Sequence, residues 1–146
     1  MSKIYVASSW RNKYQEHVVS ELRSAGHDVY DFKHPDNKTG FSWSVIDLNW
    51  RQWTLSQYCD HLKHPIAEAG YKADFEAMEW ADTFVGVMPF GISSSLEMGW
   101  AAGHGKKTIL LLHGKNEPEL MTKMLDHVCI SLAEVIELTS QKRNSE

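Results

Sequence analysis

Short apolar runs alternate with amphipathic segments along most of this chain. Each apolar run has the length and the β-branched or aromatic content of a strand. The predicted strands are residues 3–7, 27–32, 83–88, 108–112 and 128–130. The segments between them repeat their apolar residues at helical spacing. The predicted helices are residues 14–25, 66–81, 117–125 and 131–138, together with one that carries Glu97. Strands that alternate with helices predict an α/β fold, a flavodoxin-like or Rossmann-like three-layer sandwich with a five-stranded parallel sheet.

Residues 41–62 interrupt this alternation. The segment is rich in aromatic residues interleaved with polar ones, and it is too long for a simple connection. It predicts a partly helical insertion, a kind of segment that often serves as a functional lid. The chain length favours one domain over residues 1–140, followed by a polar tail at 141–146. Ser8 and Ser9 are expected to cap the first helix, and Pro65 suits the first turn of the next long one.

Composition narrows the function classes. The chain has 146 residues, 42% of them hydrophobic and 23% charged, as in an ordinary globular protein. A net charge of −4 offers no basic footprint for a nucleic acid polymer. Cys59 and Cys129 form no CxxC pair, which argues against a disulfide scaffold. No secretory segment and no apolar run of membrane-spanning length is seen, so we expect a cytoplasmic protein without a membrane partner.

A metal site or a resident cofactor is not expected. Cys59, His61 and His64 lie close together in the sequence, but no second ligand cluster has the spacing of a zinc site. His104 lies near the end of the helix that carries Glu97, where a cation complements the helix dipole.

The loop after residues 83–88 carries the most distinctive chemistry. It brings Ser93, Ser94, Ser95 and Glu97 to the first turn of a helix, at the carboxyl end of a strand. Ligands of open α/β sheets bind at that edge. A helix N-terminus favours an ionised carboxylate, which is a candidate nucleophile or general base. Ser94 and Glu97 also match a capping box, in which the glutamate only satisfies backbone donors. The pattern leaves both interpretations open.

Two other places point to the same edge of the sheet. The turn after the first strand holds Ser8, Trp10 and Arg11, and the arginine offers a fork of donors for phosphate or carboxylate. The serine turn before Glu97 is a potential anion site, because it opens a helix. Asp74 lies on the apolar stripe of the helix at 66–81, where a carboxylate is costly unless it is paired or functional. A satisfied structural aspartate is the alternative.

Three segments together resemble the nucleoside 2-deoxyribosyltransferase family, including the related 2′-deoxynucleoside 5′-monophosphate N-glycosidases. They are residues 5–11, 74–82 and 95–106, and the resemblance extends from Lys3 to about Leu112. It implies that Glu97 is the nucleophile that attacks the anomeric carbon, as in retaining glycoside hydrolysis. It also implies that Asp74 handles protonation or hydrogen bonding at the sugar and base, and that Tyr5 orients Glu97. The expected substrate-binding residues are Ser8, Trp10, Arg11, Gly91, Ser93, Ser94 and Ser95.

Divided roles for two carboxyl groups make physical sense. A nucleophile must be ionised, whereas an acid that protonates the departing base needs a raised pKa. Asp74 lies among apolar residues of its stripe, so we expect desolvation to raise its pKa.

The chain departs from the transferase pattern at Gly91. The transferases of this family carry an acidic residue there, six positions before the nucleophile. The related nucleotide hydrolases have a hydroxyl residue at that position and an arginine after the first strand, which corresponds to Arg11. An acid beside a 5′-phosphate would repel it, so its absence favours a nucleoside monophosphate over a free nucleoside.

The sequence therefore predicts cleavage of the N-glycosidic bond of a (deoxy)nucleoside or its 5′-monophosphate, with transfer to water or to another base. The alternatives are a nucleotide-binding sensor without turnover and cleavage of a nicotinamide glycosidic bond in a dinucleotide. The partner is a small-molecule nucleoside or nucleotide, and the resemblance implies a homodimer or higher homo-oligomer. Trp43, Trp50 and Trp53 either stack on the base or pack the insertion.

Overall fold

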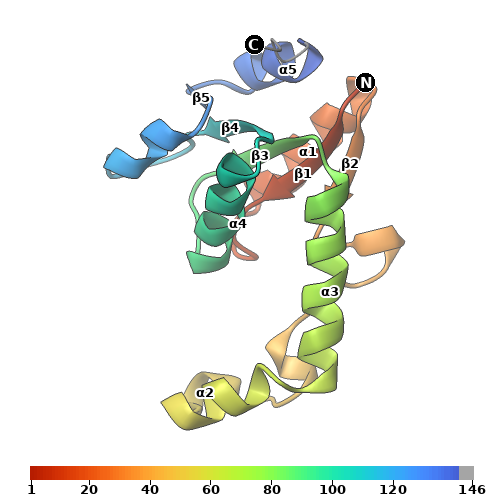
Figure 1. Cartoon of the computed structure of the whole chain (residues 1–146), viewed down its shortest axis with the longest axis vertical. Coiled ribbons are helices and arrows are strands. Elements are labelled where there is room, and N and C mark those ends of the chain that lie inside the picture. Colours follow the sequence, from red (N-terminus) through yellow and green to blue (C-terminus); the bar gives the residue numbers. More distant parts are fainter. Residues whose placement is uncertain (142–146) are drawn as a thin grey trace.

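The computed structural model describes residues 1–141, and its centre is a parallel five-stranded sheet. The strands are β1 (Lys3–Ala7), β2 (Asp28–Asp31), β3 (Thr83–Val87), β4 (Lys107–Leu111) and β5 (His127–Cys129). They lie in the order β2-β1-β3-β4-β5, and every neighbouring pair is parallel (Figure 1). This is the predicted flavodoxin-like arrangement. The predicted tail lies, from residue 142 on, outside the described residues.

Helices cover both faces of the sheet, which confirms the three-layer sandwich. The four long helices are α1 (Tyr14–Ser24), α3 (Pro65–Trp80), α4 (Ile92–Gly103) and α5 (Leu132–Ser140). Side chains alternate along a strand, so Ile4 and Val6 of β1 pack with α1 and α5 on one face. Tyr5 and Ala7 pack with α3 and α4 on the other. The alternation thereby places Tyr5 on the same face as the helices that carry Asp74 and Glu97.

Local sequence accounts for two of the helix ends. Gly26 follows α1 with φ +93°, a conformation that glycine adopts without a steric penalty. Pro65 begins α3. The expectation that Ser8 and Ser9 cap the first helix is wrong, because α1 begins only at Tyr14. The Asn12 side chain instead accepts from the Tyr14 backbone N–H.

The predicted helix at 117–125 is also wrong. Only a 3-10 turn, η4 (Leu120–Met124), forms there. Its apolar side chains at Leu120 and Met121 remain 76% and 63% exposed, so they find no surface to pack against. An amphipathic segment of this length needs such packing, since helix propensity alone is insufficient.

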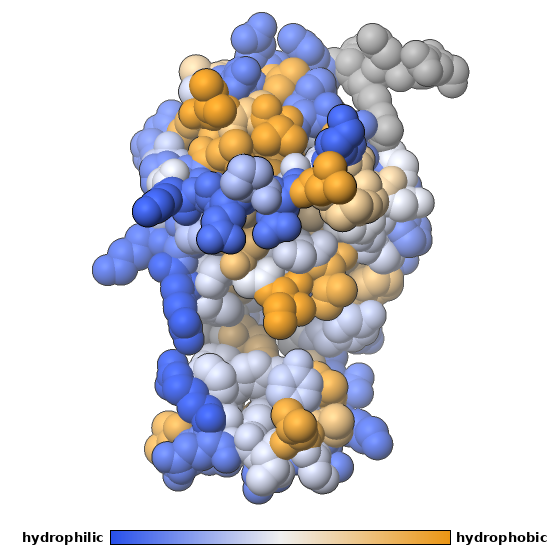
Figure 2. All heavy atoms as spheres, turned by 90° about the vertical axis from the view of Figure 1, so that its left-hand side faces the viewer, coloured by the Kyte–Doolittle hydropathy of each residue, from blue (hydrophilic) through white to orange (hydrophobic). Residues whose placement is uncertain are grey.

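The aromatic-rich insertion is partly helical, as predicted. After η1 (Pro35–Asn37) it contains η2 (Trp43–Val45), η3 (Trp50–Gln52) and α2 (Leu55–His61). These elements form a lobe at the amino end of α3, away from the sheet (Figure 1), and the space-filling view shows apolar side chains on the surface of this lobe (Figure 2).

The lobe is attached to α3 by close packing. Gly70 of α3 lies so near Phe41 that an added Cβ would come within 3.0 Å of its ring. Phe41 packs edge-on against Trp43, and Trp43 packs edge-on against Trp53. None of the helices in the described part of the chain combines the length and the apolar character that crossing a membrane requires.

Candidate functional site

Glu97 lies in the second turn of α4 and faces the sheet. Its Oε2 accepts a hydrogen bond from the hydroxyl of Tyr5, which is fully buried in β1. The capping-box interpretation is therefore wrong. Helix α4 begins at Ile92 after Gly91, so Glu97 is too far along to reach the free backbone donors, and the helix has no side-chain cap.

Asp74 of α3 has a matching partner that the sequence analysis missed. The Tyr30 hydroxyl of β2 donates to Asp74 Oδ1 at 2.8 Å. Tyr30 pairs in register with Tyr5 of β1, and their rings stack with centroids 5.5 Å apart. Two carboxyl groups are thus each bonded to one of two stacked tyrosines on neighbouring strands. The sequence does place a second tyrosine, Tyr30, in a predicted strand. Only the pairing of β1 with β2 shows that its side chain shares a face with that of Tyr5.

Burial raises the pKa values of both carboxyl groups. For Glu97 desolvation raises the pKa to about 7, the nearby charge of Asp74 adds to the rise, and the Tyr5 hydrogen bond opposes it. Position on the helix therefore does not by itself set the charge of Glu97, since desolvation opposes the ionised form. For Asp74 desolvation also raises the pKa, as expected from its apolar stripe, and the Tyr30 hydrogen bond lowers it.

The two tyrosines remain protonated donors. Burial and the adjacent carboxyl groups raise the pKa of Tyr5 and that of Tyr30 far above the ordinary value. Each hydroxyl can therefore hold one carboxyl oxygen at any pH at which the protein would be assayed.

The loop after β1 is tied to the end of β3. Ser8 Oγ donates to the Val87 carbonyl at 2.7 Å, and Asn12 Nδ2 donates to the carbonyls of Val87 and Met88 at 3.0 Å. The donor of Ser8 is thus used within the protein. The sequence analysis also missed Asn12, which fixes the loop that carries Arg11. Nothing in the sequence around Asn12 indicates that its side chain contacts the end of β3.

Arg11 and Trp10 are the exposed members of this loop. Within residues 1–141 the Arg11 guanidinium has no hydrogen bond or ion pair, so its donors are available. Trp10 is 48% exposed and packs edge-on against Phe32.

The three serines of the α4 turn do not point to one place. Ser93 is exposed and Ser94 is buried, while Ser95 Oγ donates to the Gly91 carbonyl at 3.2 Å. Within residues 1–141, Ser93 is therefore the one of the three with an exposed hydroxyl that makes no hydrogen bond. Around Gly91 there is open space, because an added Cβ would meet no atom within 4 Å.

The aromatic residues of the insertion mainly pack against their own lobe. Trp53 stacks on His61 and donates its indole N–H to Asp47 at 2.8 Å. Trp50 lies under the Arg51 guanidinium, 4.3 Å from the ring centroid. In the described part of the chain no three His, Cys, Asp or Glu side chains are grouped so as to hold a metal ion.

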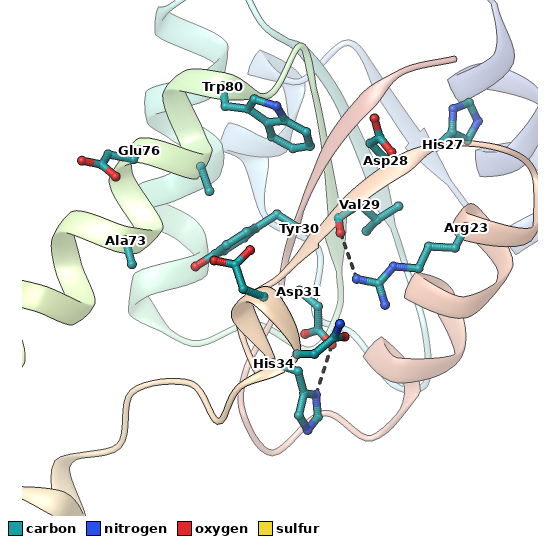
Figure 3. Close-up of a pocket in the computed structure, with 13 residues that line it drawn as sticks. Arg23, His27, Asp28, Val29, Tyr30, Asp31, His34, Ala73, Glu76 and Trp80 are labelled. Carbon is teal, nitrogen blue, oxygen red and sulfur yellow. Dashed lines mark hydrogen bonds and ion pairs between the residues drawn. The ribbon is translucent and has the colours of Figure 1, made fainter.

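A surface cavity of about 690 Å³ lies beside this pair of carboxyl groups rather than around it. It is bounded by β2, α3 and the residues that follow β2 (Figure 3). Tyr30 lines it, but neither Tyr5 nor Glu97 does. We place the candidate site at the carboxyl groups, because desolvated titratable groups near the carboxyl edge of a parallel sheet are the stronger functional indication.

Three solved structures share this architecture. A 2-deoxyribosyltransferase from Bacillus psychrosaccharolyticus is 24% identical, with a TM-score of 0.61, over 92% of this chain and 90% of its own. A CMP N-glycosidase from Clostridium botulinum is 18% identical, with a TM-score of 0.51, over 94% and 98%. A conserved protein from Enterococcus faecalis is 16% identical, with a TM-score of 0.62, over 95% and 97%.

This chain has their fold. No family model and no curated protein sequence matches it. Sequence identities of this size show a common architecture, and the activity has to be argued from the site itself.

Proposed function

We propose that this protein cleaves the N-glycosidic bond of a nucleoside or nucleoside 5′-monophosphate, with Glu97 as the nucleophile. The observation that carries the proposal is the pair of half-buried carboxyl groups, Glu97 and Asp74, each held by a tyrosine hydroxyl. Supporting it, the solved structures with this fold include a 2-deoxyribosyltransferase and a CMP N-glycosidase.

The two carboxyl groups suit a double displacement. In the first step the Glu97 carboxylate would attack the anomeric carbon, and the bond from that carbon to the base nitrogen would break. Asp74, as a neutral acid, would give its proton to the departing base. In the second step water or another base would attack the glycosyl ester, release the Glu97 carboxylate and return a proton to Asp74.

Substrate choice would depend on the two loops beside the carboxyl groups. The exposed Arg11 guanidinium, the Ser93 hydroxyl and the first backbone N–H groups of α4 offer donors for a 5′-phosphate. Gly91 adds no negative charge to this region. These features favour a monophosphate over a free nucleoside, with water or a second base as the acceptor.

The direct test measures base release. The protein is incubated with a panel of nucleosides and 5′-monophosphates, with and without a second free base, and the products are separated by chromatography. We expect native protein to release the base and Glu97→Gln to release none, although the glutamine still accepts from Tyr5. Release of base by the variant at the native rate would remove Glu97 from the chemistry.

A nucleotide sensor is the second candidate, favoured by the exposed Arg11 at the loop, whose guanidinium has no partner within residues 1–141. A sensor requires the donors but not an ionised nucleophile. Calorimetry on native protein and on Glu97→Gln separates the two functions. Nucleotide binding without base release in both proteins would establish the sensor and contradict the glycosidase.

A further inference from the structure

We propose that Tyr30 is the positioning residue for Asp74, and that its hydroxyl directs the acidic proton of Asp74 toward the departing base. The inference rests on the proposed function, but the contact that supports it is independent of any substrate. It assigns a task to a residue of β2, the strand at the edge of the sheet, which lies outside the three motifs in the sequence.

The Tyr30 contact fixes one oxygen of Asp74. Within residues 1–141, Tyr30 is the only residue with a side-chain hydrogen bond to Asp74, and it donates to Oδ1. A neutral carboxyl group carries its proton on one oxygen, and the oxygen that accepts the Tyr30 hydrogen is the poorer place for it. The proton is therefore directed to Oδ2, the oxygen that Tyr30 leaves unbonded.

The ring of Tyr30 is itself held in place. It stacks on Tyr5 with an interplanar angle of 15°, through strands that pair in register at these two residues. In Figure 3 the ring extends from β2 toward α3, the helix that carries Asp74. Strand pairing and ring stacking together restrain the Tyr30 side chain, so its hydroxyl meets Asp74 at low entropic cost.

The charged and titratable groups around Asp74 come from four elements. Tyr30 of β2 contacts it directly, and Tyr5 of β1 and Glu97 of α4 lie near enough for their charges to be coupled to it. Asp36 of η1 acts on Tyr30 and raises its pKa further. Among these groups only Tyr30 donates a hydrogen bond to Asp74, so its removal is a selective perturbation.

The experiment replaces Tyr30 with phenylalanine, which keeps the stacked ring and removes one oxygen. We expect kcat for base release to fall about 10-fold, since the hydrogen bond involves a charged or acidic group, with KM nearly unchanged. The matched control is Tyr71→Phe, which removes the same atom from an exposed tyrosine of α3. It should leave both constants at the native values.

A titration that needs no substrate provides the second measurement. The carboxyl carbon of Asp74 is followed by ¹³C NMR against pH in native protein, Tyr30→Phe and Tyr71→Phe. Tyr30 donates to the ionised form and lowers the pKa of Asp74, so Tyr30→Phe should move that titration to higher pH. If no base is released by native protein, the glycosidase proposal fails, but this titration still decides whether Tyr30 controls Asp74.

A double-mutant cycle distinguishes a specific effect on Asp74 from a general loss of structure. In an Asp74→Asn background, Tyr30→Phe should reduce kcat by much less than it does in native protein, because the acidic proton that it directs is gone. Equal reductions in the two backgrounds, or an unmoved Asp74 titration, would show that Tyr30 only packs against Tyr5 and would overturn the proposal.

Discussion

Glu97 is the residue at which burial and hydrogen bonding act in opposite directions. Desolvation favours its neutral form, and the donor from Tyr5 favours the ionised form. The result is a carboxyl group with a pKa of about 7, so a change of one pH unit alters its charge substantially. The ionisation of this side chain should therefore affect both the stability and the activity of the protein.

The first concerns stability. The folded pKa of about 7 lies above the ordinary value of 4.5, so the stability linked to Glu97 is complete below pH 4.5 and is lost as the pH rises through 7. Glu97→Gln removes this loss. The free energy of unfolding of the variant minus that of native protein should therefore be larger at pH 8 than at pH 4. The increase should be on the order of 2 kcal/mol. Urea unfolding at both pH values measures this, and an equal difference at both would contradict it.

The second prediction concerns rate. If Glu97 is the nucleophile and Asp74 the acid, kcat/KM for base release should rise with pH as Glu97 ionises and fall as Asp74 loses its proton, which gives a bell-shaped profile. Because Asp74 lies near, the observed pKa values belong to the pair rather than to one group. A pH–rate profile between 5 and 9 provides the measurement. A flat acidic limb would argue against Glu97 as the ionising group.

A third prediction tests the phosphate donors. Arg11→Ala should weaken binding of a 5′-monophosphate by about 10- to 100-fold and barely affect the matching nucleoside, since a charged hydrogen bond contributes about 1.5–3 kcal/mol. Calorimetric affinities for both ligands decide this.

The space around Gly91 allows the converse experiment. Gly91→Asp fits without a clash, adds a favourable N-cap to α4 and adds a negative charge. It should weaken the monophosphate and spare the nucleoside. Equal losses for the two ligands in both variants would show that this region does not contact the phosphate.

At the scale of elements, the loops after β1 and β2 approach the backbone so closely at Gly40 that no side chain fits there. Gly40 lies where the chain passes from the β2 loop into the insertion. An added Cβ there would be 2.1 Å from the Phe32 carbonyl oxygen and 3.1 Å from the Trp10 ring. Both neighbours belong to loops at the carboxyl edge of the sheet, so this glycine sets how closely they meet.

Gly40→Ala should therefore destabilise the protein by about 1–3 kcal/mol or more, because the clash is with backbone rather than with a flexible side chain. Gly103→Ala at the end of α4 is the matched control, since its Cβ would meet nothing within 4 Å. Thermal unfolding of both variants gives the comparison. A Gly40→Ala protein as stable as native protein would show that the two loops can move apart without loss of stability.

At the scale of the whole molecule, the insertion exposes apolar surface that its own lobe does not cover. Val45, Leu48 and Leu55 are 66%, 84% and 87% exposed, and the same lobe appears in Figure 2 with apolar side chains on its surface. Side chains that are this apolar and this exposed are available for contact with another protein.

We expect a second copy of the chain to cover this surface. Sedimentation at micromolar concentration should show a homo-oligomer, and Leu48→Ser with Leu55→Ser should shift it toward monomer. Ile130→Ser, at an equally exposed position outside the insertion, is the control. Only monomer in the native protein would contradict the expectation.

The local pattern of the sequence determined the architecture. Strand and helix periodicities differ, so five strands, the four long helices and the helical insertion could be predicted within a few residues of their ends. The failure at 117–125 has the same origin, since periodicity identifies an amphipathic segment but not the surface that it requires.

Only the tertiary structure decided how the candidate site is connected. The Tyr30–Asp74 bond joins residues 44 positions apart, and the Tyr5–Glu97 bond joins residues 92 apart. The raised pKa of Glu97 likewise depends on what surrounds the carboxyl group after folding, which outweighs its position on a helix. Residue type and spacing supply the carboxyl groups, whereas burial and strand pairing determine their partners and their charge.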